Sequence, residues 1–476
     1  MFKTLKNAWG IIDLKKKLLF TALIIVLYRL GSSIPVPFID QAKIAQTSFY
    51  RGNILEFLNI LSGGAMGQAT LFALGVSPYI TASIVVQLLT VAIPALERWS
   101  KEGEEGKKKI NVLTRIITIA LALVTSIGYV ALLSSKDVDL IRYATTVDAA
   151  GKTVYANKFL QNAIIVICYC AGAAIVMWLA EKINESGIGN GISIILFANI
   201  IAGFYTTLAL MWRISFATVG FDWLGLVLSL AFIALLLGLI LVIVWMSDAE
   251  RRIPIQYAKR VVGRKMYGGQ NTNLPLKVNM TGVMPIIFAN SIVTIPATIA
   301  EFTKKDGKFG NWVSNVFSQT SILYLVIFML LLVAFAYFYV LISFNPIEVA
   351  NNIKNNGGAI PGIRSGRPTI EFVKKVLYRV TLVGALLIVL IACLPMVIND
   401  VCNLDVIKNA INARGIGFGL TEGSKALENY QALYTGLFST LAFGGSSLMI
   451  VVGVALETTR ELEAQMSLRN YKGFLD

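Results

Sequence analysis

Side chains able to carry out acid–base, redox or metal chemistry are scarce in this 476-residue chain. It contains no histidine, and its four cysteines include no CxxC pair. No imidazole base or histidine metal ligand is available, and no zinc site or dithiol redox pair is indicated. A phosphate-cradling GxxxxGK[ST] loop is also absent. We therefore expect no cofactor and no enzymatic activity, with any energy supplied by a partner or by the membrane potential.

Ionisable side chains are also missing from the long apolar runs of the sequence. Apart from Arg29, the cores of these runs contain no Asp, Glu, Lys or Arg, and Asp222 only borders one of them. Coupled transporters and intramembrane proteases use such groups to bind an ion or to activate water. The sequence argues against both classes, although backbone carbonyls alone are able to bind an ion.

Small and polar residues gather in four of the apolar runs: 72–95, 188–210, 280–300 and 433–455. Polar residues within a membrane usually face a protein interior or a water-filled cavity. We therefore expect these four runs to line a cavity. The alternative is that their Ser, Thr and Gly residues only allow helices to pack closely.

The elements that position these residues are ten apolar runs, each about long enough to cross a bilayer, which takes roughly 20 residues. They are 18–36, 72–95, 113–134, 159–180, 188–210, 223–246, 280–300, 321–343, 380–398 and 433–455. The first run follows three lysines and lacks a small-residue cleavage site, so we expect a retained span and not a removable signal.

The distribution of charge predicts the orientation of the spans. The chain is 56% hydrophobic and only 14% charged, yet its net charge is +15. With the N-terminus in the cytosol, 28 of the 42 basic residues fall in cytosolic segments. This bias predicts ten helices with both termini cytosolic, since positive loops stay inside.

Residues 54–67 precede the second span and are too short to cross a bilayer. The sequence Ser62-Gly63-Gly64 interrupts their apolar part. Such a run is typical of a re-entrant or interfacial segment. The alternative is an ordinary outer loop with one amphipathic turn.

Two cytosolic loops have a distinctive arrangement of basic residues. In residues 248–277, basic residues alternate with β-branched and aromatic ones, which predicts a protruding hairpin. In residues 343–379, two arginines lie among Gly and Pro. These loops are suited to phosphate-rich RNA or to an acidic partner. Alternatively, their charges only orient the helices.

Four long segments carry a family resemblance: SGGAMGQATLFALGVSPYITASIVVQLL, GIGNGISIILF, RRIPIQYAKRVVGRKMYGGQNTNLPLKVNMTGVMPIIFA and NPIEVANNIKNNGGAIPGIRSGRPT. They closely resemble bacterial members of the SecY/Sec61-alpha family, whose members form the main subunit of the general protein-translocation channel. The match runs collinearly from about residue 10 to residue 456.

This resemblance implies an all-α multispanning membrane protein. Its ten transmembrane helices would form two inverted five-helix halves, residues 1–212 and 213–476, around an hourglass channel with a re-entrant plug. The plug would be about residues 54–68, which favours the re-entrant interpretation. The region between the last two spans, 397–433, is longer than we expect for this family. Part of it would form a short outer helix, or it is a tolerated surface insertion.

The resemblance also assigns site residues. The pore ring would be Val76, Ile80, Ile192, Leu196, Ile287 and Ile450, where Val76 and Leu196 depart from the usual isoleucine. The plug would include Leu58, Ile60, Leu61, Ser62, Gly63 and Gly64, and the polar lateral-gate residues would be Gln87, Asn290 and Ser291. The partner-binding residues would be Arg251, Arg252, Lys259, Arg260, Arg264, Lys265 and Arg364.

The implied function is a protein-conducting channel of the bacterial plasma (inner) membrane. It would secrete unfolded polypeptides and insert membrane proteins laterally into the lipid. The implied partners are the small subunits SecE and SecG, the SecA motor ATPase, the ribosome, signal sequences and membrane lipid. Two other hypotheses are a solute transporter and a membrane anchor for nucleic acid or ribosomes without a pore.

Overall fold

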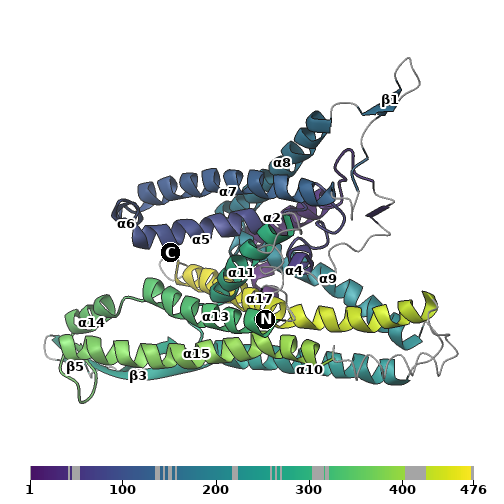
Figure 1. Ribbon diagram of the computed structural model, residues 1–476. Coiled ribbons are helices and arrows are strands. Elements are labelled where there is room, and N and C mark those ends of the chain that lie inside the picture. Colours follow the sequence, from purple (N-terminus) through teal and green to yellow (C-terminus); the bar gives the residue numbers. More distant parts are fainter. Residues whose placement is uncertain are drawn as a thin grey trace.

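The apolar runs of the sequence form helices, because in hydrocarbon only internal hydrogen bonds satisfy the backbone. The computed structural model (Figure 1) describes residues 2–40, 43–44, 54–134, 140–142, 145–147, 153–155, 158–216, 223–257, 260–262, 265–267, 271–302, 316, 321–402 and 425–472. Within this part, six helices are long and apolar enough to cross a membrane, or seven if one sharply bent pair counts as a span. Each of the ten predicted spans coincides with a helix or with that bent pair.

The N-terminal part of the chain contains eight described helices. They are α1 (Phe2–Trp9), α2 (Ile12–Gly31), α4 (Ile54–Leu61), α5 (Ser77–Ala92), α6 (Pro94–Lys101), α7 (Glu104–Leu133), α8 (Lys158–Ser186) and α9 (Gly191–Phe216). A short hairpin of β1 (Thr145–Val147) and β2 (Thr153–Tyr155) lies between α7 and α8.

The second predicted span, 72–95, differs from the structure at both ends. Residues 71–76 are turns, and α5 begins at Ser77 with Pro78 in its first turn. Proline fits there because the first N–H groups of a helix have no partner within the helix. Near the other end, Ile93 is extended before Pro94, and the axes of α5 and α6 differ by 101°. This bend has a local cause, because the residue before a proline is disfavoured in the α conformation.

The C-terminal part contains six described helices. They are α10 (Trp223–Asp248), α11 (Met284–Phe302), α13 (Ile322–Ser343), α14 (Pro346–Asn355), α15 (Arg367–Cys402) and α17 (Lys425–Lys472). Helices α15 and α17 extend beyond the predicted spans into 397–433. The expected separate outer helix falls mainly on residues 403–424, which lie outside the described residues.

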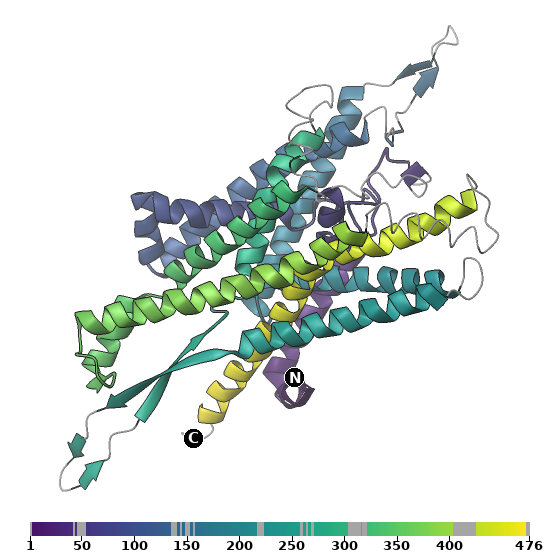
Figure 2. The same ribbon diagram turned by 60° about the horizontal axis from the view of Figure 1, so that its bottom comes forward.

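The predicted hairpin is confirmed, and it modifies the expected all-α fold. Strand β3 (Glu250–Tyr257) pairs antiparallel with β6 (Asn271–Lys277), with Ile253 opposite Leu274. Strand β3 also pairs with β7 (Gly358–Ala359), so both basic loops join one three-stranded sheet. Beyond it, β4 (Arg260–Val262) pairs with β5 (Lys265–Tyr267). Figure 2 shows this extension projecting from the helical body, at the end opposite to β1 and β2.

One hydrophobic core joins the two parts of the chain. It includes buried side chains of α5, α9, α11, α15 and α17, and α17 packs directly against both α9 and α15. Many large aliphatic side chains of α10 and α13 are instead exposed on the outside. A protein surrounded by lipid tails needs apolar side chains on its outer surface, and these helices have them around a tightly packed interior.

Candidate functional site

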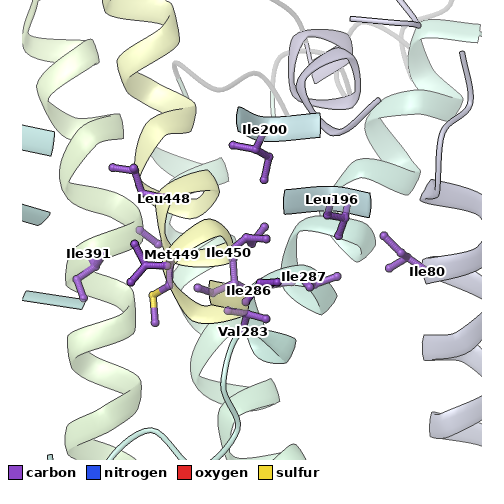
Figure 3. Close-up of a cluster of buried hydrophobic side chains, with 14 of the residues drawn as sticks. Ile80, Leu196, Ile200, Val283, Ile286, Ile287, Ile391, Leu448, Met449 and Ile450 are labelled. Carbon is purple, nitrogen blue, oxygen red and sulfur yellow. The ribbon is translucent and has the colours of Figure 1, made fainter. Parts of the chain in front are cut away.

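Four of the six predicted ring residues meet in the middle of the molecule. Ile80, Leu196, Ile287 and Ile450 come from α5, α9, α11 and α17 and line a common cavity of about 240 Å³. Figure 3 shows these side chains converging between helices of both parts of the chain. Val76 and Ile192 belong to the same hydrophobic cluster but do not line the cavity.

The predicted plug segment covers one side of this cavity. Leu58 and Leu61 line it, and Ile60 and Leu61 pack against the core cluster. After α4 the backbone turns back through Ser62, Gly63 and Gly64, where both glycines have positive φ values of 68° and 91°. Ser62, Ala65, Met66 and Ala69 are buried, so this segment is packed into the protein and is not a free outer loop.

Two of the three predicted lateral-gate residues lie on the seam between the two parts of the chain. Helix α11 contacts both α5 and α7 there. Asn290 and Ser291 of α11 line the cavity, opposite Ser77 and Thr81 of α5. Asn290 is 5% exposed, and its Nδ2 has no hydrogen-bond partner among the described residues. Gln87 lies further along α5 and does not line the cavity.

A second, larger cavity lies at the other end of the seam. It has a volume of about 710 Å³ and is lined by residues of α5 and α6 on one side and of α13, α14 and α15 on the other. The seam is thus hollow at two levels.

The predicted partner-binding residues that the structure describes lie on the extension formed by the two basic loops. Arg251 and Arg252 are exposed on β3, where Arg252 Nε donates to Glu250 Oε1 at 2.6 Å. Arg364 is exposed in the turn between β7 and α15. The pairing of β3 with β7 brings these arginines, which are about 110 residues apart in sequence, onto one protruding body.

The tip of the extension is described only by its backbone. Arg260 is paired with Tyr267 and Lys265 with Val262 on β4 and β5. Lys259 and Arg264 lie outside the described residues.

Sequence reasoning noticed Arg29 but missed the carbonyls that it binds, and it missed the nearby pair of Asn199 and Tyr28. The Arg29 guanidinium donates to the carbonyls of Gly63 and Ala198, and Asn199 Nδ2 donates to the Leu61 carbonyl and to Tyr28 Oη. The signal that was available is the isolated intramembrane charge itself, because such a charge needs nearby acceptors.

Comparison with known proteins agrees with this architecture. A family model described as SecY matches residues 70–459. The protein translocase subunit SecY of Streptomyces galbus is 42% identical over 482 residues, and that of Halalkalibacterium halodurans is 37% identical over 485, each match covering 100% of both chains.

Solved structures show the same fold at low sequence identity. A protein-conducting channel matches with a TM-score of 0.57 and 17% identity, covering 95% of this chain and 92% of that one. Sec61 in a canine ribosome-channel complex matches with a TM-score of 0.54 and 16% identity over the same shares. With relatives this similar over their whole length, and with the family model matching most of its residues, the chain belongs to the SecY family.

Proposed function

We propose that this protein is a protein-conducting channel, through which unfolded polypeptides cross the membrane and membrane proteins enter the lipid. The observation that carries the proposal is that branched aliphatic side chains from both parts of the chain line one cavity, together with Leu58 and Leu61 of the predicted plug segment. Among the described residues no cluster of His, Cys, Asp and Glu is able to hold a metal ion.

The ring suits a substrate of variable chemistry. Aliphatic side chains offer no hydrogen bonds, so they do not select one translocating sequence over another. A narrow apolar constriction also tends to dewet and so impedes ions. The 240 Å³ cavity is smaller than ordinary small-molecule sites, which span about 300–1,000 Å³. We therefore propose that the ring dilates before a peptide passes and that this conformation is the closed one.

Lateral insertion requires the seam to open. We assign the lateral gate to α5 and α7 on one side and α11 and α13 on the other, within ten membrane spans and two inverted halves, 1–212 and 213–476. The halves would hinge between α9 and α10. A polar seam that contains Asn290 and Ser291 separates at a smaller cost than a fully apolar contact. An apolar signal helix that enters it gains about 25 cal/mol for each Å² of apolar surface removed from water.

The basic extension is the proposed docking surface. Arg251, Arg252 and Arg364 are exposed on one body and carry positive charge toward phosphate-rich or acidic partners. We propose the ribosome and the SecA motor as these partners, with SecE and SecG as membrane subunits. In this arrangement both termini lie in the cytosol of a bacterial cell and the helices span its plasma membrane.

The test is site-specific photo-crosslinking to a secretory precursor stalled midway. Probes at Leu196 and Ile287, which line the cavity, should form adducts with the precursor. A probe at Leu237, a 57%-exposed leucine on the outer face of α10, is the matched control and should not. Adducts at Leu237 but not at the two cavity positions would refute the pore assignment. Loss of function on altering the extension, combined with silent ring substitutions, would instead support an anchor without a pore.

A further inference from the structure

The re-entrant segment is held from behind by an arginine within the apolar body. Arg29, in the last turn of α2, donates from Nη1 to the Gly63 carbonyl at 3.2 Å and from Nη2 to the Ala198 carbonyl at 2.7 Å. Arg29 forms no ion pair in the part of the chain that the structure describes. The guanidinium therefore depends on these two carbonyls for its hydrogen bonds, and one of them belongs to the segment.

A buried amide adds a second contact to the same turn. Asn199 of α9 is fully buried, and its Nδ2 donates to the Leu61 carbonyl at 2.7 Å and to Tyr28 Oη at 2.9 Å. Leu61 is the last residue of α4. The final carbonyls of a helix lack partners within the helix and carry partial negative charge. Asn199 thus caps the C-terminal end of α4, and Arg29 binds the turn that follows it.

Gly63 permits this close approach. A Cβ placed on Gly63 would lie 2.7 Å from Arg29 Nη1 and 2.9 Å from Asn199 Oδ1. Within the described part of the chain Asn199 Oδ1 has no hydrogen-bond partner, so the two hydrogen bonds from Nδ2 position this amide. The geometry at Gly63 is therefore matched to the guanidinium and the amide together.

All these anchors belong to one half of the molecule. Side-chain hydrogen bonds that reach the described residues 58–70 from outside come from α2, α9, α7 and α8, the last two through Tyr129 Oη to the Met66 carbonyl and Tyr169 Oη to the Ala69 carbonyl. Toward the other half, α4 meets α11, and among the described residues no side-chain hydrogen bond joins α11 to residues 58–70. When the halves separate, the segment should stay with the N-terminal half unless its end is released.

We propose that Arg29 and Asn199 form a latch that holds the re-entrant segment in the closed pore and so sets how often the channel opens without a substrate. Tyr129 and Tyr169 fix the base of the segment, while the latch fixes the end of α4 that covers the ring. This inference rests on the proposed channel function, and it adds residues outside the plug and the ring as determinants of gating.

The test is ion conductance of the reconstituted channel in planar bilayers without substrate. Asn199→Leu keeps the size of the side chain and removes the two hydrogen bonds from its amide. Arg29→Lys keeps the positive charge and removes the guanidinium, which donates to two carbonyls at once. Each should raise the resting open population about tenfold, equivalent to about 1.4 kcal/mol. Asn184→Leu, which loses an amide bond to the Gly191 N–H away from the segment, and Arg115→Lys, which alters an ion pair with Glu181, are the matched controls.

Hydrogen exchange supplies a second measurement, which distinguishes local release of the segment from general destabilisation of the protein. Peptides from 58–66 should exchange about tenfold faster in both latch variants, while peptides from α8 should be unchanged. Wild-type conductance and exchange in both variants, with a leak on deletion of 58–66, would overturn the latch. No leak on that deletion, together with a wild-type channel that passes no precursor, would overturn the channel proposal itself, and the latch with it.

Discussion

Replacing Asn290 by leucine should make the channel harder to open. Asn290 lies on the seam side of α11 and is 5% exposed, and it lines the cavity together with Ile287 and Leu196. Its Nδ2 has no partner among the residues that the structure describes. A buried, unpaired donor destabilises the state that buries it. In the open seam this donor meets water or substrate, so the asparagine favours opening. Leucine has a similar volume and fills the same space without a donor.

The magnitude follows from the cost of one unsatisfied buried polar group, about 1–3 kcal/mol. Removing it stabilises the closed seam by that amount, which corresponds to roughly a 5- to 150-fold smaller open population. A more apolar signal sequence should compensate. Each buried CH₂ contributes about 0.8 kcal/mol, so roughly two to four added methylene groups restore opening.

The assay is the initial rate of precursor translocation into proteoliposomes, measured for a series of signal sequences of increasing hydrophobicity. Asn290→Leu should slow weakly apolar signals most and strongly apolar signals least. Asn184→Leu, which removes a side chain whose Oδ1 is already hydrogen-bonded to the Gly191 N–H, serves as the control. Faster translocation by Asn290→Leu, or an equal effect on all signals, would contradict the argument.

Three further changes test other parts of the structure. Gly63→Ala places a Cβ within 2.7 Å of Arg29 Nη1 at a φ of 68°, so it should loosen the segment and raise resting conductance about tenfold; unchanged conductance would contradict the close approach. Arg364→Glu should impair partner-driven secretion while the protein itself still inserts into the membrane. The matched charge reversal is Arg367→Glu, at an arginine that is already paired with Glu371. Normal secretion by Arg364→Glu would refute the docking role. Gly172→Ala places a Cβ against the Leu71 carbonyl oxygen and should lower the free energy of unfolding by about 1–3 kcal/mol, measured by thermal denaturation. At Gly238 an added Cβ meets no described atom within 4 Å, so Gly238→Ala is the control and should leave stability unchanged. Equal effects of the two substitutions would refute the packing argument.

Local pattern was sufficient to predict most helices and the cytosolic hairpin. Each predicted span coincides with a helix or, at 72–95, mainly with the bent pair α5 and α6, because apolar runs must satisfy their backbone hydrogen bonds internally. The alternation in 248–277 likewise predicted the strands, since a period of two places one set of side chains on each face. The departures at Ser77 and Pro94 have local causes, in the turns that precede α5 and in the proline that follows Ile93.

Tertiary structure alone decided which distant residues meet. The ring combines side chains from Ile80 to Ile450, and β3 pairs with a strand about 100 residues away. The bond from Asn199 to the Leu61 carbonyl spans 138 residues. Nothing near Asn199 in the sequence marks it as the partner of a turn that far away. Helix formation depends on hydrogen bonds between residues four apart, so the sequence determines it directly, whereas the seal and its latch depend on how the helices pack.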